Sequence, residues 1–200
     1  IVITTDSGST FTTKQLPPYS GVISATLANS LKNIIFATNQ GVVYTSHDTG
    51  STWSDFRPQY NFSWNDVNSA ATLEITTVVG NHGRIYRIFQ QNMYSAVSPT
   101  MQNLNAVSAW STSRVLIAGD NGTILRTIPP SSTFSLSNSG VTSNLYDISL
   151  SSTTDVGYAV GDSGVILRTT NMGGNWQSQI SGISSTLRSV KLITDTIGFA

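Results

Sequence analysis

The sequence contains no cysteine, a single glutamate and few charges of either sign. Without cysteine, a disulfide framework and any metal site built on thiolates are excluded. Ten basic residues balance ten acidic ones and only 10% of residues are charged, which argues against a general phosphate-binding surface and against a nucleic-acid partner. No apolar run approaches the length of a membrane span, so we expect no membrane insertion.

The residues that replace charge are small and polar. The chain has 30 Ser, 26 Thr, 15 Asn and 16 Gly, a composition poor in helix formers and rich in strand and turn residues. Hydrophobic residues make up 38% of it, which is typical of a globular rather than a disordered chain. This composition favours an extracytoplasmic protein: secreted, periplasmic, lumenal or on the cell surface. Because the chain starts at Ile1 with no signal-like segment, we expect a processed end or a cut through a longer chain.

Three sets of residues repeat along the chain with a period of about 41 residues. The first set is a glycine that ends a polar turn before an apolar strand, at Gly41, Gly83, Gly122 and Gly164. The second set is aromatic, at Phe11, Trp53, Tyr94, Phe134 and Trp176, and we expect these side chains to supply apolar area to the core between blades. The third set is β-branched, at Val67, Val107, Ile148 and Val190. Because the three sets stay in phase, we interpret the chain as an array of one structural unit.

Each repeat contains four short strands separated by turn residues. In the clearest copy they cover residues 146–150, 157–160, 165–169 and 176–180. Short strands with this period predict an all-β fold, a β-propeller of four-stranded antiparallel blades. We expect one propeller domain over residues 1–200, with partial blades at 1–20 and 185–200 and whole blades at 21–60, 61–101, 102–142 and 143–184.

The two ends of the chain fall inside a blade. The N-terminal segment supplies third and fourth strands, and the C-terminal segment supplies first and second strands. The sequence therefore predicts about five blades in one of two arrangements. Either the two halves pair and close a five-bladed ring, or the chain forms part of a larger propeller.

The turn before the repeated aromatic carries the most specific motif. Residues 46–53 read Ser-His-Asp-Thr-Gly-Ser-Thr-Trp, residues 4–11 are a near match and residues 169–176 a weaker one. This motif resembles the Asp-box, or bacterial neuraminidase repeat. The resemblance implies that the aspartate accepts backbone N–H bonds in the turn between strands three and four, and that the aromatic tucks between blades. The positions that carry it are Asp6, Gly8, Phe11, Ser46, Asp48, Gly50, Thr52, Trp53, Asn171, Gly173 and Trp176.

A second resemblance joins the two kinds of turn. The stretch 160–170, Val-Gly-Asp-Ser-Gly-Val-Ile-Leu-Arg-Thr-Thr, runs into Gly-Gly-Asn-Trp at 173–176, and 118–127 is another good copy. These repeats resemble the Ycf48-like family of photosystem II assembly and stability factors and their bacterial relatives. In that family, third-strand arginines bind a protein partner. The resemblance therefore implies a partner-binding row of Arg87, Arg126 and Arg168, whereas pairing with blade carboxylates or carbonyls is the alternative.

Catalytic motifs are weak. Gly161-Asp162-Ser163-Gly164 resembles the nucleophile region of trypsin-like proteases, but it is one copy of the repeated turn. A sialidase would need a glutamate partner, and Glu74 is the only glutamate. Asp66 and Asp147, two blades apart on channel-lining first strands, are candidates for a glycoside hydrolase acid and base, or for strand-end caps.

Other candidate sites follow from residue type alone. The two histidines, His47 and His82, and the scattered aspartates have no metal-ligand spacing, so we expect neither a metal nor another cofactor. Asn61 and Asn121 begin formal N-glycosylation sequons. Four of the aromatic residues outside the phased series are candidates either for the core or for stacking on sugars or a partner. They are Tyr19, Tyr60, Trp64 and Trp110.

These observations favour a non-enzymatic, extracytoplasmic propeller that acts as a protein-interaction or structural module, with a protein partner or self-assembly as its mode of action. A carbohydrate-active or carbohydrate-binding propeller is the alternative, with a glycan as ligand. A third possibility is a spacer in a cell-surface or filament protein.

Overall fold

The computed structural model is all-β and describes residues 2–4, 6–17, 21–28, 33–57, 63–70, 75–89, 92–128, 132–195 and 197–200. Four sheets of four strands follow one another along the chain, and in each sheet consecutive strands pair antiparallel. The first two sheets are β3 (Val22–Ala28), β4 (Asn33–Thr38), β5 (Val43–Ser46), β6 (Ser54–Phe56) and β7 (Trp64–Ser69), β8 (Thr76–Gly80), β9 (Ile85–Phe89), β10 (Asn92–Ala96). The next two are β11 (Leu104–Ser111), β12 (Arg114–Gly119), β13 (Ile124–Thr127), β14 (Phe134–Ser137) and β15 (Leu145–Leu150), β16 (Gly157–Gly161), β17 (Ile166–Thr169), β18 (Gln177–Gln179). The predicted blade architecture is confirmed.

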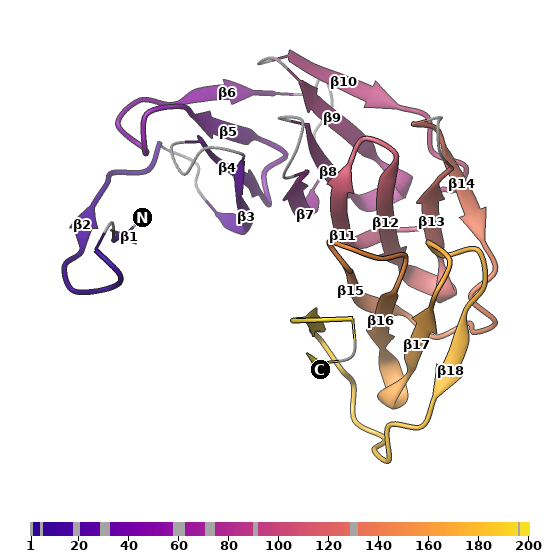
Figure 1. Ribbon diagram of the computed structural model, residues 1–200. Coiled ribbons are helices and arrows are strands. Elements are labelled where there is room, and N and C mark those ends of the chain that lie inside the picture. The colour runs from indigo at the N-terminus through magenta and orange to yellow at the C-terminus, as the bar shows by residue number, and fades with distance from the viewer. Residues whose placement is uncertain are drawn as a thin grey trace.

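The four blades stand side by side in an open arc (Figure 1). At its N-terminal end, β1 (Val2–Ile3) pairs with β2 (Thr12–Thr13), and at its C-terminal end β19 (Lys191–Leu192) pairs with β20 (Gly198–Phe199). These terminal sheets contain no other described strand, so the chain ends do not pair into a five-bladed ring. The arrangement is that of part of a larger propeller. No helix in the described ranges has the length and hydropathy needed to cross a membrane.

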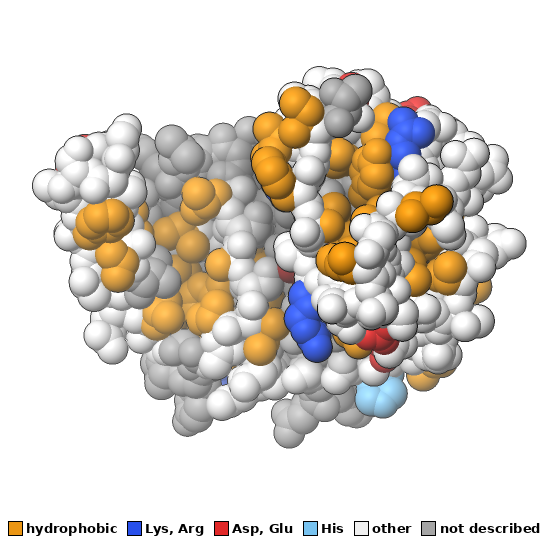
Figure 2. All heavy atoms as spheres, turned by 90° about the horizontal axis from the view of Figure 1, so that it is seen from below, with side chains coloured by type: hydrophobic (Ala, Val, Ile, Leu, Met, Phe, Trp, Pro, Cys, Tyr) orange, Lys and Arg blue, Asp and Glu red, His pale blue; other side chains and the backbone are white. Residues whose placement is uncertain are grey.

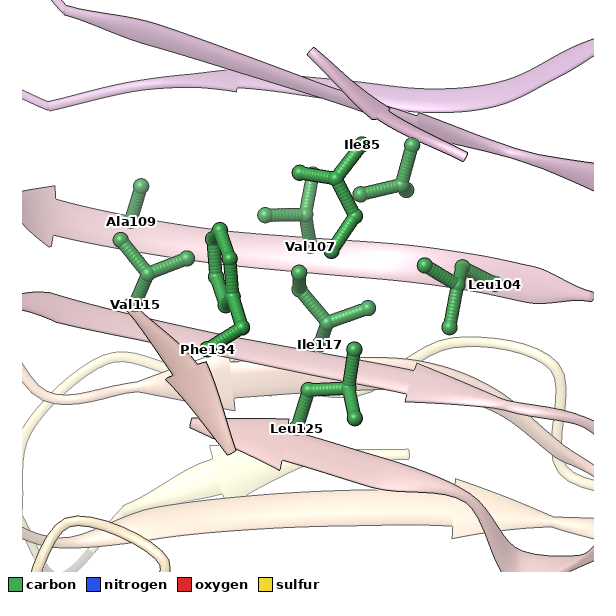
Figure 3. Close-up of a cluster of buried hydrophobic side chains, with 9 residues drawn as sticks. Ile85, Leu104, Val107, Ala109, Val115, Ile117, Leu125 and Phe134 are labelled. Carbon is green, nitrogen blue, oxygen red and sulfur yellow. The ribbon is translucent and has the colours of Figure 1, made fainter. Parts of the chain in front are cut away.

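The middle strands are buried on both faces because blades pack on each side of them. In β12 every residue after Arg114 is buried, and all five residues of β8 are buried. Figure 3 shows one of the resulting layers, in which Ile85 of one blade lies against Val107, Ile117 and Leu125 of the next. The third repeated set, at Val67, Val107, Ile148 and Val190, is at most 7% exposed, and its first three members belong to these layers.

The terminal sheets leave apolar side chains uncovered. Val2 and Phe11 at one end and Ile193 and Phe199 at the other are 63 to 69% exposed. Figure 2 shows a face of the molecule with few charged side chains, on which hydrophobic side chains gather in and beside the recess between two lobes. Each terminal sheet has only two strands, so less of its apolar surface is covered than in the four-stranded blades.

The repeated aromatic packs against the preceding blade at two of its five positions, Phe134 and Trp176, which join layers shared with that blade. Trp53 packs on Phe36 of its own blade, at 5.0 Å between ring centroids. Phe11 is exposed because no sheet precedes its own in the chain. The structure contains no sheet on the side where Phe11 would pack, so its place between blades stays a prediction.

Tyr94 departs from the series because its strand is offset by one residue. Phe134 pairs with Thr127, but the equivalent pair in the preceding blade is Met93 with Ile88. A shift of one residue turns a side chain to the opposite face of the sheet. Met93 therefore packs in the core and Tyr94 is 56% exposed, which corrects the packing predicted for it.

The turn between the second and third strands has the same geometry in three blades. Each turn contains a short 3-10 segment: η1 (Asn81–Gly83), η2 (Asp120–Gly122) or η3 (Asp162–Gly164). In each segment the middle residue and the glycine adopt positive φ. At Gly122, with φ +67°, an added Cβ would lie 1.9 Å from the carbonyl oxygen of Val141. Glycine is therefore required here by its conformation and by the close approach of the next connection.

The turn after β5 has the interactions implied by the Asp-box resemblance. The Asp48 Oδ1 atom accepts hydrogen bonds from the backbone N–H groups of Ser51 and Thr52 at 2.9 and 2.8 Å, and Oδ2 accepts one from the Thr52 hydroxyl at 2.7 Å. Ser46 donates to Asp48 and accepts the N–H of Gly50. These bonds favour the ionised carboxylate, and those from Thr52 are the largest cause of the lowered pKa of Asp48.

The other two copies differ in charge. Asp6 accepts the N–H and hydroxyl of Thr10 at 2.8 and 2.6 Å, and these bonds lower its pKa to about 2. Asn171 keeps the same turn with a neutral amide, whose Oδ1 accepts the N–H of Asn175 at 2.9 Å and the hydroxyl of Thr169 at 3.0 Å. An ionised carboxylate is therefore not required for the turn conformation.

We expect Gly122→Ala to destabilise the protein far more than Gly140→Ala. Both glycines have positive φ, but no atom lies within 4 Å of a Cβ added at Gly140. The control substitution should cost about 1 kcal/mol from backbone strain alone. The Gly122 variant adds a clash with the Val141 carbonyl and should cost about 3 kcal/mol or more. Urea unfolding of both variants measures the difference, and equal costs would contradict the close approach.

We expect Asp48→Asn to lower the melting temperature at pH 7 and to lose this effect in acid. A carboxyl whose folded-state pKa lies below its ordinary value of 3.8 stabilises the fold above that pH, and the contribution is lost as pH falls. Thermal melts of both proteins between pH 7 and pH 2 measure this. The converse variant Asn171→Asp should gain a pH dependence of the same sign. Identical melting curves for Asp48→Asn and wild type at every pH would contradict this role.

Candidate functional site: inner strands and third-strand arginines

The first strands of neighbouring blades pack against one another along the inner edge of the arc. In each blade the pairing of the first strand with the second shifts by one residue near its start, and the residue just after the shift repeats every 40 to 42 positions. These residues, with their equivalent in the C-terminal segment, are Ser24, Asp66, Ala106, Asp147 and Ser189. The structure thus places both candidate catalytic aspartates at equivalent inner positions, two blades apart.

The carboxylate of Asp66 links three blades. Its Oδ1 accepts the Ser24 hydroxyl of the preceding blade at 2.6 Å and the N–H of Val67 at 2.8 Å. Its Oδ2 accepts the N–H of Val107, in the following blade, at 2.8 Å. Burial raises the pKa of Asp66, these hydrogen bonds oppose the rise, and the negative charge of Asp147 adds to it.

Asp147 makes the same kind of link towards the C-terminal segment. Its Oδ1 accepts the N–H of Ile148 at 2.8 Å, and its Oδ2 accepts the Ser189 hydroxyl and the Val190 N–H at 2.8 and 2.7 Å. Both carboxylates are thus engaged by several donors fixed in neighbouring strands. This geometry agrees with the alternative role considered for Asp66 and Asp147, in which they satisfy backbone groups of inner strands.

A second repeated position on the inner strands lies two residues after that of Asp66, and the sequence did not predict its role. Its polar side chain accepts a backbone N–H from the next first strand at 3.0 to 3.4 Å in all four blades. The acceptors are Thr26, Asn68, Ser108 and Ser149, and the donors are Ser69, Ala109, Leu150 and Leu192. The signal that identifies these residues is a polar side chain with the 41-residue period.

Asparagine amides add a third link near the start of the inner strands. Asn65 donates to the carbonyl of Leu104 and Asn105 donates to the carbonyl of Leu145, both at 2.9 Å and both in the following blade. Asn105 also donates to the Asp120 carboxylate of its own blade at 2.8 Å. Side chains therefore satisfy donors and acceptors of the inner strands that no strand partner takes.

Arg87 lies in the layer between its own blade and the next. Its Nη2 donates to the carbonyl of Thr112 at 3.1 Å, and its guanidinium carbon lies 4.9 Å from the ring centroid of Phe134. Burial lowers the pKa of Arg87. Carbonyl capping, the structural alternative for the arginine row, is therefore present at this residue. Whether Arg87 also contacts a partner stays a prediction.

Arg126 and Arg168 occupy the equivalent places on β13 and β17. Both are half-buried, and neither forms a salt bridge within the described residues. The aliphatic part of Arg126 lies beside the Asp-box turn of the next blade: a Cβ added to Gly173 would be 3.6 Å from Arg126 Cδ. Thr45, which interrupts the row, is 2% exposed. The structure thus brings two partly accessible cations to equivalent positions of adjacent blades.

The candidate serine and histidines that the structure describes do not come together in one site. Ser163 and His82 lie in equivalent turns of different blades, and His47 follows β5 and contacts Asn33. Trp64 is a core residue, 1% exposed, whose indole N–H donates to the carbonyl of Gly41. No group of three or more potential metal ligands occurs in the described ranges. Glu74, Asn61, Tyr19 and Tyr60 lie outside the described residues, and Asn121 is exposed in its turn.

Comparison with known proteins identifies the fold. No protein-family model matches the chain, and no curated protein sequence does. Among solved structures, YCF48 from Cyanidioschyzon merolae is similar over 98% of this chain and 69% of its own, at 15% identity and a TM-score of 0.74. YCF48 bound to D1 peptide is similar over 99% of this chain and 66% of its own, at 17% identity and a TM-score of 0.72. The chain spans about two thirds of their length, and over nearly all of its own length it has the fold of the YCF48 propellers.

Proposed function

We propose that the protein is a non-enzymatic propeller that binds a protein partner outside the cytoplasm. Its fold is that of YCF48, and one of the similar YCF48 structures is bound to D1 peptide. The low charge and the abundance of Ser, Thr and Asn support an extracytoplasmic location. The inner aspartates are engaged in links between blades, which supports a binding rather than a catalytic role.

The observation that carries the proposal is the pair of uncompensated arginines. Arg57 and Arg114 are paired with Asp55 and Asp155, but no described carboxylate pairs with Arg126 or Arg168. A half-buried guanidinium gains most from an acceptor that is itself charged, because charge-assisted bonds are stronger in a partly desolvated site. A partner segment that carries carboxylates at the spacing of two adjacent blades would supply these acceptors.

The double variant Arg126→Glu/Arg168→Glu tests the proposal. Fluorescence polarisation would be measured with labelled acidic, neutral and basic peptides, including the D1 peptide of the YCF48 complex. We expect the wild type to bind acidic peptides and the double variant to bind them about 100-fold more weakly, because two charge-assisted contacts become repulsive.

The control is Arg84→Glu, which makes the same kind of substitution once, at an exposed residue just before β9. It should leave peptide binding unchanged. Circular dichroism and thermal melting establish that all variants are folded. Equal loss of binding in Arg84→Glu, or unchanged binding in the double variant, would contradict the assignment to the third-strand arginines.

A further inference from the structure

A groove of about 490 Å3 lies at the C-terminal ends of the inner strands, across three adjacent first strands and the C-terminal segment. Its volume falls within the ~300–1,000 Å3 usual for small-molecule sites. Half of its lining residues are Ser, Thr or Asn, and only two are charged. The lining includes Asn68, Ser108, Trp110, Thr153, Lys191 and Asp195.

Trp110 supplies aromatic surface to this groove, and its position is set by an irregularity of the strand. Ala109 pairs with Val115 and Ser111 pairs with Arg114, so the pairing shifts at the intervening Trp110. Such a bulge re-aims a side chain relative to the regular alternation of the strand. Trp110 also lies outside the phased aromatic series that packs between blades, and it is only half-buried.

Polar groups of the groove are held in place by the links between inner strands. The Asn68 Oδ1 accepts the N–H of Ala109 at 3.0 Å, which fixes the side-chain amide, and no described residue accepts from its Nδ2. The Ser108 Oγ accepts the N–H of Leu150 at 3.0 Å, which leaves its hydroxyl proton to donate. The groove therefore presents oriented donors beside the indole.

The C-terminal segment presents an acceptor to the groove. The Asp195 carboxylate accepts the hydroxyl of Ser151 and, at 3.4 Å, that of Thr153. The bond from Ser151 is the main cause of the lowered pKa of Asp195, so this group is ionised at neutral pH. Lys191 lines the same groove, so one positive and one negative charge balance and the wall selects neither anions nor cations.

We propose that this groove binds a neutral oligosaccharide, with one sugar ring stacked on Trp110. Sugars combine an apolar ring face, which stacks on aromatic side chains, with hydroxyls that both donate and accept hydrogen bonds. An added peptide strand fits less well, because backbone N–H groups at this end of the inner strands are already taken by Asn68, Ser108 and Ser149. The proposal does not depend on the arginine row.

The test uses the full 200-residue chain with maltotriose, cellotriose, laminaritriose and tri-N-acetylchitotriose as probes. Isothermal titration calorimetry and saturation-transfer NMR measure binding. We expect at least one trisaccharide to bind, and Trp110→Ala to weaken binding about tenfold or more through loss of stacking. Trp110→Phe should retain part of the affinity, because it keeps an aromatic face.

The matched control is Tyr94→Ala, which removes an exposed aromatic from the outer strand of the blade that contains Asn68. It should bind as the wild type does. Absence of binding to all four probes, or equal binding by wild type and Trp110→Ala, overturns the proposal. Displacement of the sugar from this groove by an acidic peptide also overturns the proposal, because it would assign the groove to a protein partner. Arg126→Glu/Arg168→Glu should leave sugar binding unchanged, because neither arginine lines the groove.

Discussion

The fold depends on one interaction, the hydrogen bond from the backbone N–H of an inner strand to a side chain of the preceding blade. First strands of neighbouring blades do not pair with one another as a sheet, so their backbone groups need other partners. Asp66 and Asn68 supply these acceptors on one strand. Asp147 does so at the position equivalent to Asp66, and Thr26, Ser108 and Ser149 do so at the position equivalent to Asn68. Apolar layers then pack the blades further out, where Leu125 and Phe134 exclude water. The polar inner edge sets the spacing at which these layers meet.

Local signals predicted the parts of the fold that depend on a single turn. The recurring glycines predicted turns, and in the structure these glycines have positive φ. The Ser-x-Asp-x-Gly-x-Thr-Trp motif predicted the hydrogen bonds around Asp48. The packing of Tyr94 was mispredicted because a one-residue offset in β10 is invisible to a count of residues along the chain. The contact of Arg87 with Phe134 joins residues 47 positions apart in different blades, so no local pattern contains it.

The candidate sites were predictable to different degrees for the same reason. The periodic arginines could be found by aligning repeats, but only the structure distinguishes Arg87, held by Thr112, from Arg126 and Arg168, which have no described acidic partner. The inner aspartates could be placed at the channel, but their engagement by backbone donors depends on the approach of neighbouring blades. The groove at Trp110 arises where several strands end together, and the out-of-phase tryptophan was its one sequence signal.

The links between inner strands have a consequence for folding cooperativity. Each blade is coupled almost entirely to the blades beside it, so the chain behaves as a short one-dimensional array in which stability is a sum of unit terms and nearest-neighbour terms. The central sheets, β7–β10 and β11–β14, have a complete blade on both sides, whereas β1–β2 and β19–β20 each adjoin one complete blade. The middle strands of the two central blades therefore have the most complete set of neighbours, and amide protons should exchange most slowly in β8 and β12.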